Sequence, residues 1–214
     1  MSGTRILGFD YDLPMARPNR SHEKRAELMP IVAQAFSELG YRKATTAELA
    51  ARCGVQENIL YRLWNDKKAM FAASIDYLFD ATMQVWQGQI DQAEQDPDGP
   101  TAAERILAYD SEHRGEKGFY RITFAALSET DDPDVLEALR SMYSRFTVFI
   151  EQQVSEHRAT HDDTGMPETW AVTWAILGLA TAADIGRETG LLDAAKRQAM
   201  IAEVGRLLLE GRAK

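Results

Sequence analysis

The sequence predicts an all-α fold of about nine helices, in which a three-helix head at the N-terminal end precedes a larger C-terminal helical bundle. From Ser21 onward the apolar residues recur with a helical period, and no segment shows the alternation typical of a β-strand. Prolines, glycines and short polar runs divide this pattern into lengths typical of helices. Residues 1–20 show no sustained period, so we expect them to form a flexible arm.

Four helices are predicted before the first long loop. The first runs from Ser21 to Leu39 and ends at Gly40, with an apolar face made of Leu28, Ile31, Val32, Ala35, Phe36 and Leu39. Pro30 lies inside it and is expected either to kink the helix or to precede its regular part. Short helices follow at 46–53 and 56–63. A long one spans 66–92, and its stripe consists of Phe71, Ile75, Leu78, Thr82 and Val85.

The run from Asp96 to Pro100 is a loop, because it contains two prolines, a glycine and two aspartates. Beyond it, helices are predicted near 101–113, 118–129 and 132–158. A polar segment at 158–167 separates them from two last helices near 168–188 and 193–212.

Hydrophobic residues make up 45% of the chain and charged residues 27%, which is ordinary for a soluble globular protein. No apolar run reaches the ~18 residues of a membrane span, and Ala171–Ala183 is expected to be a buried helix instead. The N-terminus shows no secretory signal. Cys53, the single cysteine, cannot form an internal disulfide. These features favour a cytoplasmic protein without a membrane partner.

The net charge of −9 argues at first against a nucleic-acid partner. The charge is uneven, however, because residues 17–71 carry ten Lys or Arg against six Asp or Glu. Exposed charges are screened over ~8 Å at physiological salt. A partner bound to the basic head would therefore feel mainly the charge of the head and little of that of the acidic C-terminal part, the body. The distribution is compatible with DNA contact through the head.

The stretch from Thr46 to Leu63 has the spacing of a helix-turn-helix, whose second helix enters the major groove of DNA. Ala50 is small where two helices must cross closely, and Gly54 lies at a sharp turn that requires a positive φ. Thr46 is placed to cap the first of the two helices. The residues expected to be buried between these helices and the first one are Leu49, Val55, Leu60 and Leu63.

The segment from Arg25 to Phe71 resembles the DNA-binding domain of TetR-family regulators. The matching residues are Phe36, Gly40-Tyr41, Thr45-Thr46, Glu48-Leu49-Ala50, Cys53-Gly54-Val55, Leu60-Tyr61, Trp64 and Lys67. The resemblance implies a DNA-binding domain at 21–65 and a ligand-binding and dimerisation domain at 66–214. It also implies a homodimeric regulator without a cofactor, a repressor released from a palindromic operator by a small molecule.

The family pattern implies that Thr46, Tyr61 and Lys67 contact DNA phosphates, and Arg42 and Lys43 are further candidates by their charge. Base contacts are expected from the helix at 56–63, through Gln56, Glu57, Asn58 and Arg62. Gln56, Asn58 and Trp64 depart from the usual family residues, so the operator sequence is not predicted. The alternatives are a core position for Tyr61 and a solvated surface position for Lys67.

The resemblance also implies a ligand pocket among the fourth to eighth helices. The candidate lining residues are Trp86, Tyr109, His113, Tyr143, Phe146 and Trp174. This mixture suggests a largely apolar or aromatic ligand with a few polar anchors. Each residue could instead pack in the core.

Small and apolar residues on the last two helices predict a dimer interface of four helices, two from each chain. The residues concerned are Ala171, Ala175, Gly178, Ala182, Ile201, Val204 and Leu208. Packing within one chain is the alternative.

Two other classes of protein compete with a regulator. An enzyme is suggested by His157 and His161 with Asp162-Asp163, as a metal site, or by Glu112-His113, as an acid–base pair. No nucleophile, phosphate-binding loop or cofactor motif accompanies them, so we expect no enzyme and no metal. A helical ligand-binding protein without a DNA role is the other class, and the intact register from Thr46 to Leu63 argues against it.

Overall fold

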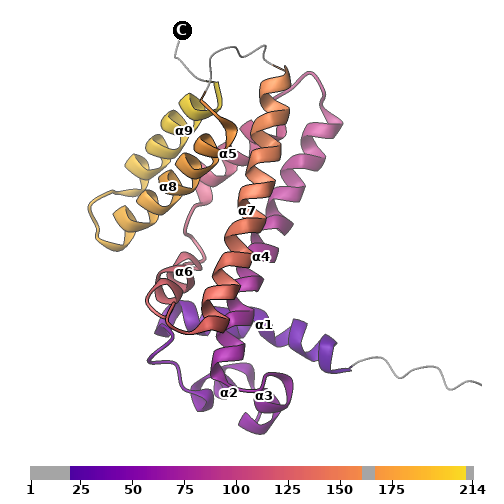
Figure 1. Cartoon of the computed structure of the whole chain (residues 1–214), viewed down its shortest axis with the longest axis vertical. Helices are drawn as coiled ribbons and strands as arrows, with labels where there is room; N and C mark the ends of the chain where they lie inside the picture. The colour runs from indigo at the N-terminus through magenta and orange to yellow at the C-terminus, as the bar shows by residue number, and fades with distance from the viewer. Residues whose placement is uncertain (1–19, 161–166, 211–214) are drawn as a thin grey trace, which may run out of the picture.

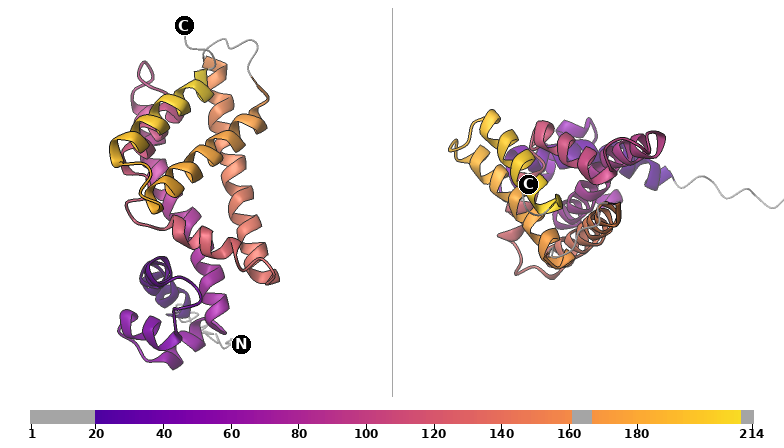
Figure 2. Two further views of the ribbon diagram at one scale, coloured as in Figure 1. Left: turned by 90° about the vertical axis from the view of Figure 1, so that its left-hand side faces the viewer. Right: turned by 90° about the horizontal axis from the view of Figure 1, so that it is seen from above.

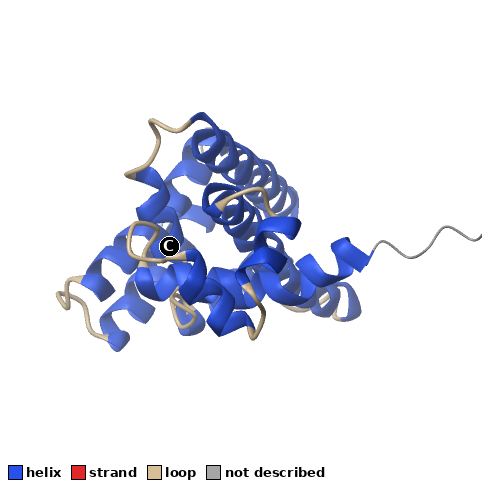
Figure 3. Ribbon diagram, turned by 90° about the horizontal axis from the view of Figure 1, so that it is seen from below, coloured by secondary structure: helices blue, strands red, loops and turns tan. Residues whose placement is uncertain are grey.

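The computed structural model describes residues 20–160 and 167–210, and every regular element in these two ranges is a helix (Figure 3). The all-α prediction is confirmed. The helices are α1 (Arg20–Leu39), α2 (Thr46–Cys53), α3 (Glu57–Leu63), α4 (Lys67–Gln95), α5 (Ala102–His113), α6 (Tyr120–Leu127), α7 (Pro133–Thr160), α8 (Thr169–Glu188) and α9 (Ala194–Glu210). The arm predicted at 1–20 lies, apart from Arg20, outside the described residues.

Helices α1, α2 and α3 gather at one end of the molecule, and α4 rises from this head into the body alongside α7 (Figure 1). Helices α8 and α9 lie side by side on one flank of the body, as the view from above shows (Figure 2). Helix α5 packs against both α4 and α9. The long helices α4 and α7 therefore form the spine that joins the head to the remaining helices.

The head has an aromatic centre to which α4 contributes. The Phe36 ring of α1 meets the Phe71 ring of α4 edge-on at 5.1 Å, and the Tyr41 ring lies 4.6 Å from Phe71. The other fully buried residues around them are Leu28, Val32, Leu49, Leu60, Leu63 and Met70. Because Met70 and Phe71 belong to α4, the first turns of this helix complete the core of the head.

Two details of the first helix differ from the prediction. Ile31, which was predicted to lie on the apolar face, is 38% exposed. Ala33 and Ser37, which were not assigned to that face, are buried. The reason is that α1 packs on two sides, against α2 and α4 and also against α6. Pro30 is exposed and lies inside a helix that continues on both sides of it.

Local capping explains where the helices begin. The side chain of Asp66 accepts a hydrogen bond of 2.7 Å from the backbone N–H of Ala69 and so starts α4. Thr101 and Glu104 form a reciprocal capping box at the start of α5. Both helices begin within one residue of the predicted position because these signals are local.

Candidate DNA interface and internal cavity

The turn between α2 and α3 is closed by backbone hydrogen bonds. Gly54 has a φ of 63°, and the N–H of Val55 donates to the Ala50 carbonyl at 3.0 Å, which ends α2 in a left-handed turn. A Cβ at Gly54 would meet nothing within 4 Å, so the backbone angle rather than space requires glycine. Ala50 is buried as predicted, whereas Val55 is half-buried.

The N-cap of α2 is Thr45 and not Thr46. The Thr45 Oγ1 accepts a hydrogen bond of 3.2 Å from the Glu48 N–H, and Thr46 is the first helical residue. Both threonines are adjacent and have the same capping chemistry, so only the backbone conformation at Thr45 distinguishes them.

Helix α3 turns its polar face to solvent. The four residues predicted to contact bases are all exposed: Gln56, Glu57, Asn58 and Arg62. On the opposite side, Leu60 and Leu63 are completely buried against the head. The protein's own body therefore leaves the outer face of α3 open, as entry into a groove requires.

Tyr61 and Thr46 lie together beside this face. Tyr61 is 48% exposed, which excludes the core position considered from the sequence, and its hydroxyl donates to Thr46 Oγ1 at 3.2 Å. Two hydroxyl groups are thus held together at the start of α2, where a phosphate oxygen could accept from either.

Lys67 links the start of α4 to the loop between α1 and α2 by hydrogen bonds. Its Nζ donates to the carbonyls of Tyr41 and Ala44, both at 3.0 Å, and lies 4.5 Å from the centre of the Tyr41 ring. The side chain is half-buried, so a fully solvated lysine is the wrong description. An ammonium group has three protons, and these two bonds leave one for another acceptor.

Arg42 and Lys43 are both exposed, and Arg42 also contacts the body. The Arg42 Nε donates to Glu129 Oε1, in the segment between α6 and α7, at 2.7 Å. Nearby, the Lys68 Nζ lies 2.8 Å from Asp134 and 3.3 Å from Asp132. The hydrogen bonds that the Lys68 ammonium donates to these two carboxylates raise the pKa of Lys68. Charges of opposite sign therefore join the head to the α6–α7 segment.

The body contains a cavity of about 280 Å³, partly open to solvent, between α4, α5, α6, α7, α8 and α9. Five of the six residues predicted to line a pocket do line it: Trp86, Tyr109, His113, Tyr143 and Phe146. Trp174 does not, because it is 54% exposed and stacks outside, on Tyr143, at 6.3 Å. Packing against α7 and α9 turns a different side of α8 inward, which carries Ile176, Leu177, Ala180 and Asp184.

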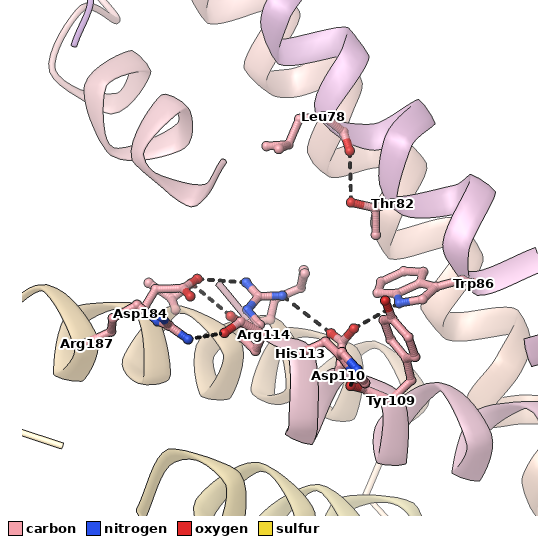
Figure 4. A network of polar contacts seen from close by, with 11 residues as sticks. Leu78, Thr82, Trp86, Tyr109, Asp110, His113, Arg114, Asp184 and Arg187 are labelled. Atoms are coloured by element: carbon pink, nitrogen blue, oxygen red, sulfur yellow. Dashed lines mark hydrogen bonds and ion pairs between the residues drawn. The ribbon is translucent and has the colours of Figure 1, made fainter. Parts of the chain in front are cut away.

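A polar network on the cavity wall was missed in the sequence. Arg114 lies between two carboxylates, with Nη2 2.8 Å from Asp184 and Nη1 3.5 Å from Asp110 (Figure 4). Asp110 also accepts a hydrogen bond of 3.0 Å from the Trp86 indole. One signal was available, since Asp184 is the only charged residue in the run from Thr169 to Gly186. Burial raises the pKa of the Asp184 carboxyl, and the charge of Arg114 opposes this shift.

The loop between α5 and α6 connects this network to the head. Arg187 of α8 donates to the Arg114 carbonyl at 2.6 Å. Four residues later, the Gly118 carbonyl accepts a hydrogen bond of 2.7 Å from Ser37 of α1. The loop is therefore attached to the cavity wall at one end and to the head at the other.

The family model for bacterial regulatory proteins of the tetR family matches residues 33–74, which hold the C-terminal end of α1, the helix-turn-helix and the start of α4. Residues 33–74 therefore form a domain of the TetR type. The nucleoid occlusion factor SlmA of Yersinia enterocolitica is 37% identical over 68 residues, which are 31% of this chain and 34% of SlmA. The chain thus matches about a third of the length of such curated relatives.

Solved structures of TetR type extend the likeness over the body. A putative TetR-family transcriptional regulator from Rhodococcus sp. has a TM-score of 0.72 at 14% identity, covering 88% of this chain and 99% of that one. The transcriptional regulator FadR of Bacillus subtilis, solved with stearoyl-CoA, has a TM-score of 0.63 at 14% identity, with the same coverage of both chains. At these identities the likeness shows the fold alone.

Helix α8 presents an apolar face to solvent. Among the predicted interface residues, Ala175, Gly178, Ala182 and Val204 are exposed, while Ala171 and Leu208 are half-buried. Ile201 is 4% exposed and lines the cavity, so its assignment to the interface was wrong. Trp170, Trp174 and Ile185 extend the exposed face along α8. Among the described residues, α8 is the one helix long and apolar enough to span a membrane, a test that core helices also pass.

The residues considered for an enzyme do not form one site in the described part of the chain. No group of three His, Cys, Asp or Glu there could hold a metal ion. His157 is buried, with Nδ1 2.9 Å from Thr101 Oγ1, while His161, Asp162 and Asp163 lie outside the described residues. His113 lines the cavity and donates from Nδ1 to the Tyr109 carbonyl at 3.0 Å, whereas Glu112 is exposed.

Proposed function

We propose that this chain is a cytoplasmic, homodimeric transcriptional regulator, and not an enzyme, that leaves its DNA operator when a small molecule fills the cavity. The observation that carries the proposal is the uncovered polar face of α3, on a head attached to a cavity-bearing body. The match of residues 33–74 to the tetR-family model supports the DNA-binding part. The FadR complex with stearoyl-CoA supports the ligand-binding part, because a protein of this fold holds a small molecule.

On DNA, α3 would lie in the major groove, with Gln56, Glu57, Asn58 and Arg62 towards the base edges. Thr46, Tyr61 and Lys43 would contact phosphates, together with the remaining proton of Lys67. Arg42 would join them by exchanging Glu129 for a phosphate. The surrounding acidic body would keep the protein oriented with its head towards DNA.

The apolar face of α8 supports a dimer built on α8 and α9, because a solvent-exposed row of tryptophan, isoleucine and small residues is covered in stable proteins. Gly178 offers a clean test, since a side chain there would meet nothing within 4 Å inside one chain. Gly178→Glu should therefore leave the fold intact and give a monomer in sedimentation. Gly88→Glu, on α4 and equally unobstructed, is the matched control and should stay dimeric. A dimeric Gly178→Glu protein would refute this interface.

Regulation would act through the α5–α6 loop, which is attached to the cavity wall at one end and to the head at the other. A ligand that moves Arg114 would pull on the loop whose Gly118 holds Ser37, and so tilt α1. Because half-sites on DNA have a fixed spacing, a changed distance between two heads prevents both from docking. Shifting such an equilibrium from 1:99 to 99:1 requires the ligand to prefer one state by ~5.5 kcal/mol.

Selection of bound sequences from random DNA tests the proposal directly. We expect enrichment of a palindrome whose half-sites are separated by about one helical turn, ~10 base pairs, or a multiple of it. The variant Gln56→Ala/Asn58→Ala is the control, because both side chains are exposed and the fold does not depend on them. It should bind DNA without that preference. If the wild-type protein enriches no sequence, the chain is a helical ligand-binding protein without a DNA role.

A further inference from the structure

One acceptor on the cavity wall lacks a donor. Asp184 is 2% exposed and lines the cavity, and its Oδ2 accepts from Arg114 at 2.8 Å. Its Oδ1 is buried without a hydrogen-bond partner among the described residues. A buried carboxylate oxygen normally accepts at least one hydrogen bond, since it has lost its water. The unmatched oxygen is therefore a place where a ligand donor would be bound.

A second acceptor lies on α7. Gln153 is buried and lines the cavity, and its Nε2 donates to Glu156 at 3.1 Å. Its Oε1 has no hydrogen-bond partner within residues 20–160 and 167–210. Two elements of the cavity wall thus present oxygen atoms that can accept but not donate.

Among the described residues that line the cavity, carboxylates outnumber cationic groups. Asp110 and Asp184 flank the single guanidinium of Arg114 (Figure 4). The other charged residues of the lining, within the described ranges, are Glu116 and Lys117 of the α5–α6 loop, which have opposite signs. Arg187, which is outside the lining, also acts on Asp184 through its positive charge and reduces this imbalance. An anionic ligand seeking Arg114 would still meet a carboxylate on either side, whereas a cation would find two carboxylates.

Aromatic rings make up much of the remaining wall. The Trp86 and Phe149 rings stack at 5.3 Å, and Phe146 meets Trp86 edge-on at 5.7 Å. Tyr109 and His113 stack at 4.3 Å on the neighbouring helix. Ring faces attract cations and cover apolar groups. The volume of about 280 Å³ is near the lower end of the ~300–1,000 Å³ range of ligand pockets, which indicates a small ligand.

We propose that the cavity binds a small organic cation, a protonated amine with an aromatic or branched apolar body, whose N–H groups donate to Asp184 Oδ1. Gln153 Oε1 is the second acceptor available to the ligand. The claim that this amine is the effector rests on the function proposed above; the claim that it binds does not. An ammonium at Asp184 competes with Arg114 for the same carboxylate and so acts on the α5–α6 loop.

Three probes that share one skeleton test the charge preference. Calorimetric titration of the full-length protein with 4-phenylbutylamine, 4-phenylbutan-1-ol and 4-phenylbutyrate compares a cation, a neutral molecule and an anion. We expect the amine to bind at least ten-fold more tightly than the alcohol, and the carboxylate to bind most weakly. Equal affinities, or a preference for the carboxylate, would overturn the proposal without any variant being needed.

The variant Asp184→Asn tests the position. It should lower the affinity for the amine at least ten-fold and leave that for the alcohol unchanged. Asp98→Asn removes the same charge from an exposed loop and should change neither affinity. If Asp184→Asn binds the amine as the wild type does, the site is elsewhere and the proposal fails.

Operator binding separates this inference from the proposed function. An Asp184-dependent preference for the amine supports the cation site whether or not the amine releases DNA. An operator that stays bound in the presence of saturating amine contradicts only the role of the amine as effector. A protein that binds an operator but does not distinguish amine from alcohol keeps its function and loses the cation site.

Discussion

The Arg42 guanidinium of the head donates from Nε to Glu129 Oε1 of the body at 2.7 Å, across 87 positions of sequence. Arg42 is 78% exposed at its side chain, and Glu129 is 19% exposed. The more buried partner is thus the carboxylate, which follows the end of α6. Since Arg42 is also a predicted phosphate contact, the body competes with DNA for this cation.

Glu129→Gln should tighten operator binding by about two- to five-fold per half-site, because an exposed and therefore weak ion pair no longer holds Arg42. The slope of log affinity against log salt should steepen by ~1–2 for a dimer with two freed arginines. Fluorescence anisotropy at several salt concentrations measures both. In an Arg42→Ala background the same change should have much less effect. An equal gain in that background would mean that Glu129 acts on DNA without Arg42.

Tyr61→Phe should weaken binding to operator and random DNA by similar factors, since a phosphate contact carries no sequence information. The free energy of unfolding should change by less than about 1 kcal/mol, because the bond from Tyr61 to Thr46 is exposed. Binding and urea unfolding of the same preparation check the two parts. Weaker binding to the operator alone would instead assign Tyr61 to the bases.

Gly54→Ala should destabilise the protein by ~1 kcal/mol, because φ at this position is 63° and L-residues with a Cβ resist it. Gly88→Ala is the matched control, since Gly88 lies inside α4 and a Cβ there also meets nothing within 4 Å. That change should stabilise the protein by up to ~1 kcal/mol through helix propensity. Urea unfolding of both variants should therefore give shifts of opposite sign; a common sign would show that the strain argument is wrong.

Asp184 should make stability depend on pH. Burial raises the pKa of its carboxyl in the folded protein, an effect that Asp110 adds to and that Arg114 and Arg187 oppose. Burial also raises the pKa of Tyr143, on which the charges of Arg114 and Asp184 act in opposite directions. The folded state therefore holds this proton more tightly than the unfolded state, whose pKa is about 4. Its contribution to stability is largest below pH ~4 and is lost as the pH rises through the raised pKa.

The difference in unfolding free energy between wild type and Asp184→Asn isolates this effect from other carboxylates. The wild type should lose stability relative to the variant between pH ~4 and neutrality. The variant also leaves Arg114 with Asp110 alone, which adds a constant offset, so the trend with pH is the test. A difference that stays constant, or that moves the other way, would contradict a raised pKa.

The helix positions and the exposed face of α3 were accessible from the sequence because their determinants are local. Asp66 and the Thr101–Glu104 pair act within three residues, and Gly54 acts through its own φ. The spacing of the apolar residues within α3 is enough to predict that Leu60 and Leu63 lie on the side opposite the polar face. The same reasoning chose Thr46 over Thr45 as the cap, because adjacent threonines are equivalent until the backbone is known.

The cavity was less accessible. Its aromatic lining was largely predicted, but Trp174 was placed inside and Asp184 was not considered. Both residues lie on α8, whose apolar residues nearly encircle it, so the sequence does not say which side faces inward. Contacts with α7 and α9 decide that question.

By itself, the sequence determined that this chain is helical, where its helices begin and end, and that its head carries an open helix-turn-helix. These properties depend on interactions over a few residues, which caps, glycines and apolar periods encode directly. Only the tertiary structure decided that Arg114 lies between Asp110 and Asp184, that Ile201 faces the cavity, and that Arg42 meets Glu129. Such contacts depend on how whole helices rotate and pack against one another, and many distant side chains share in setting that arrangement.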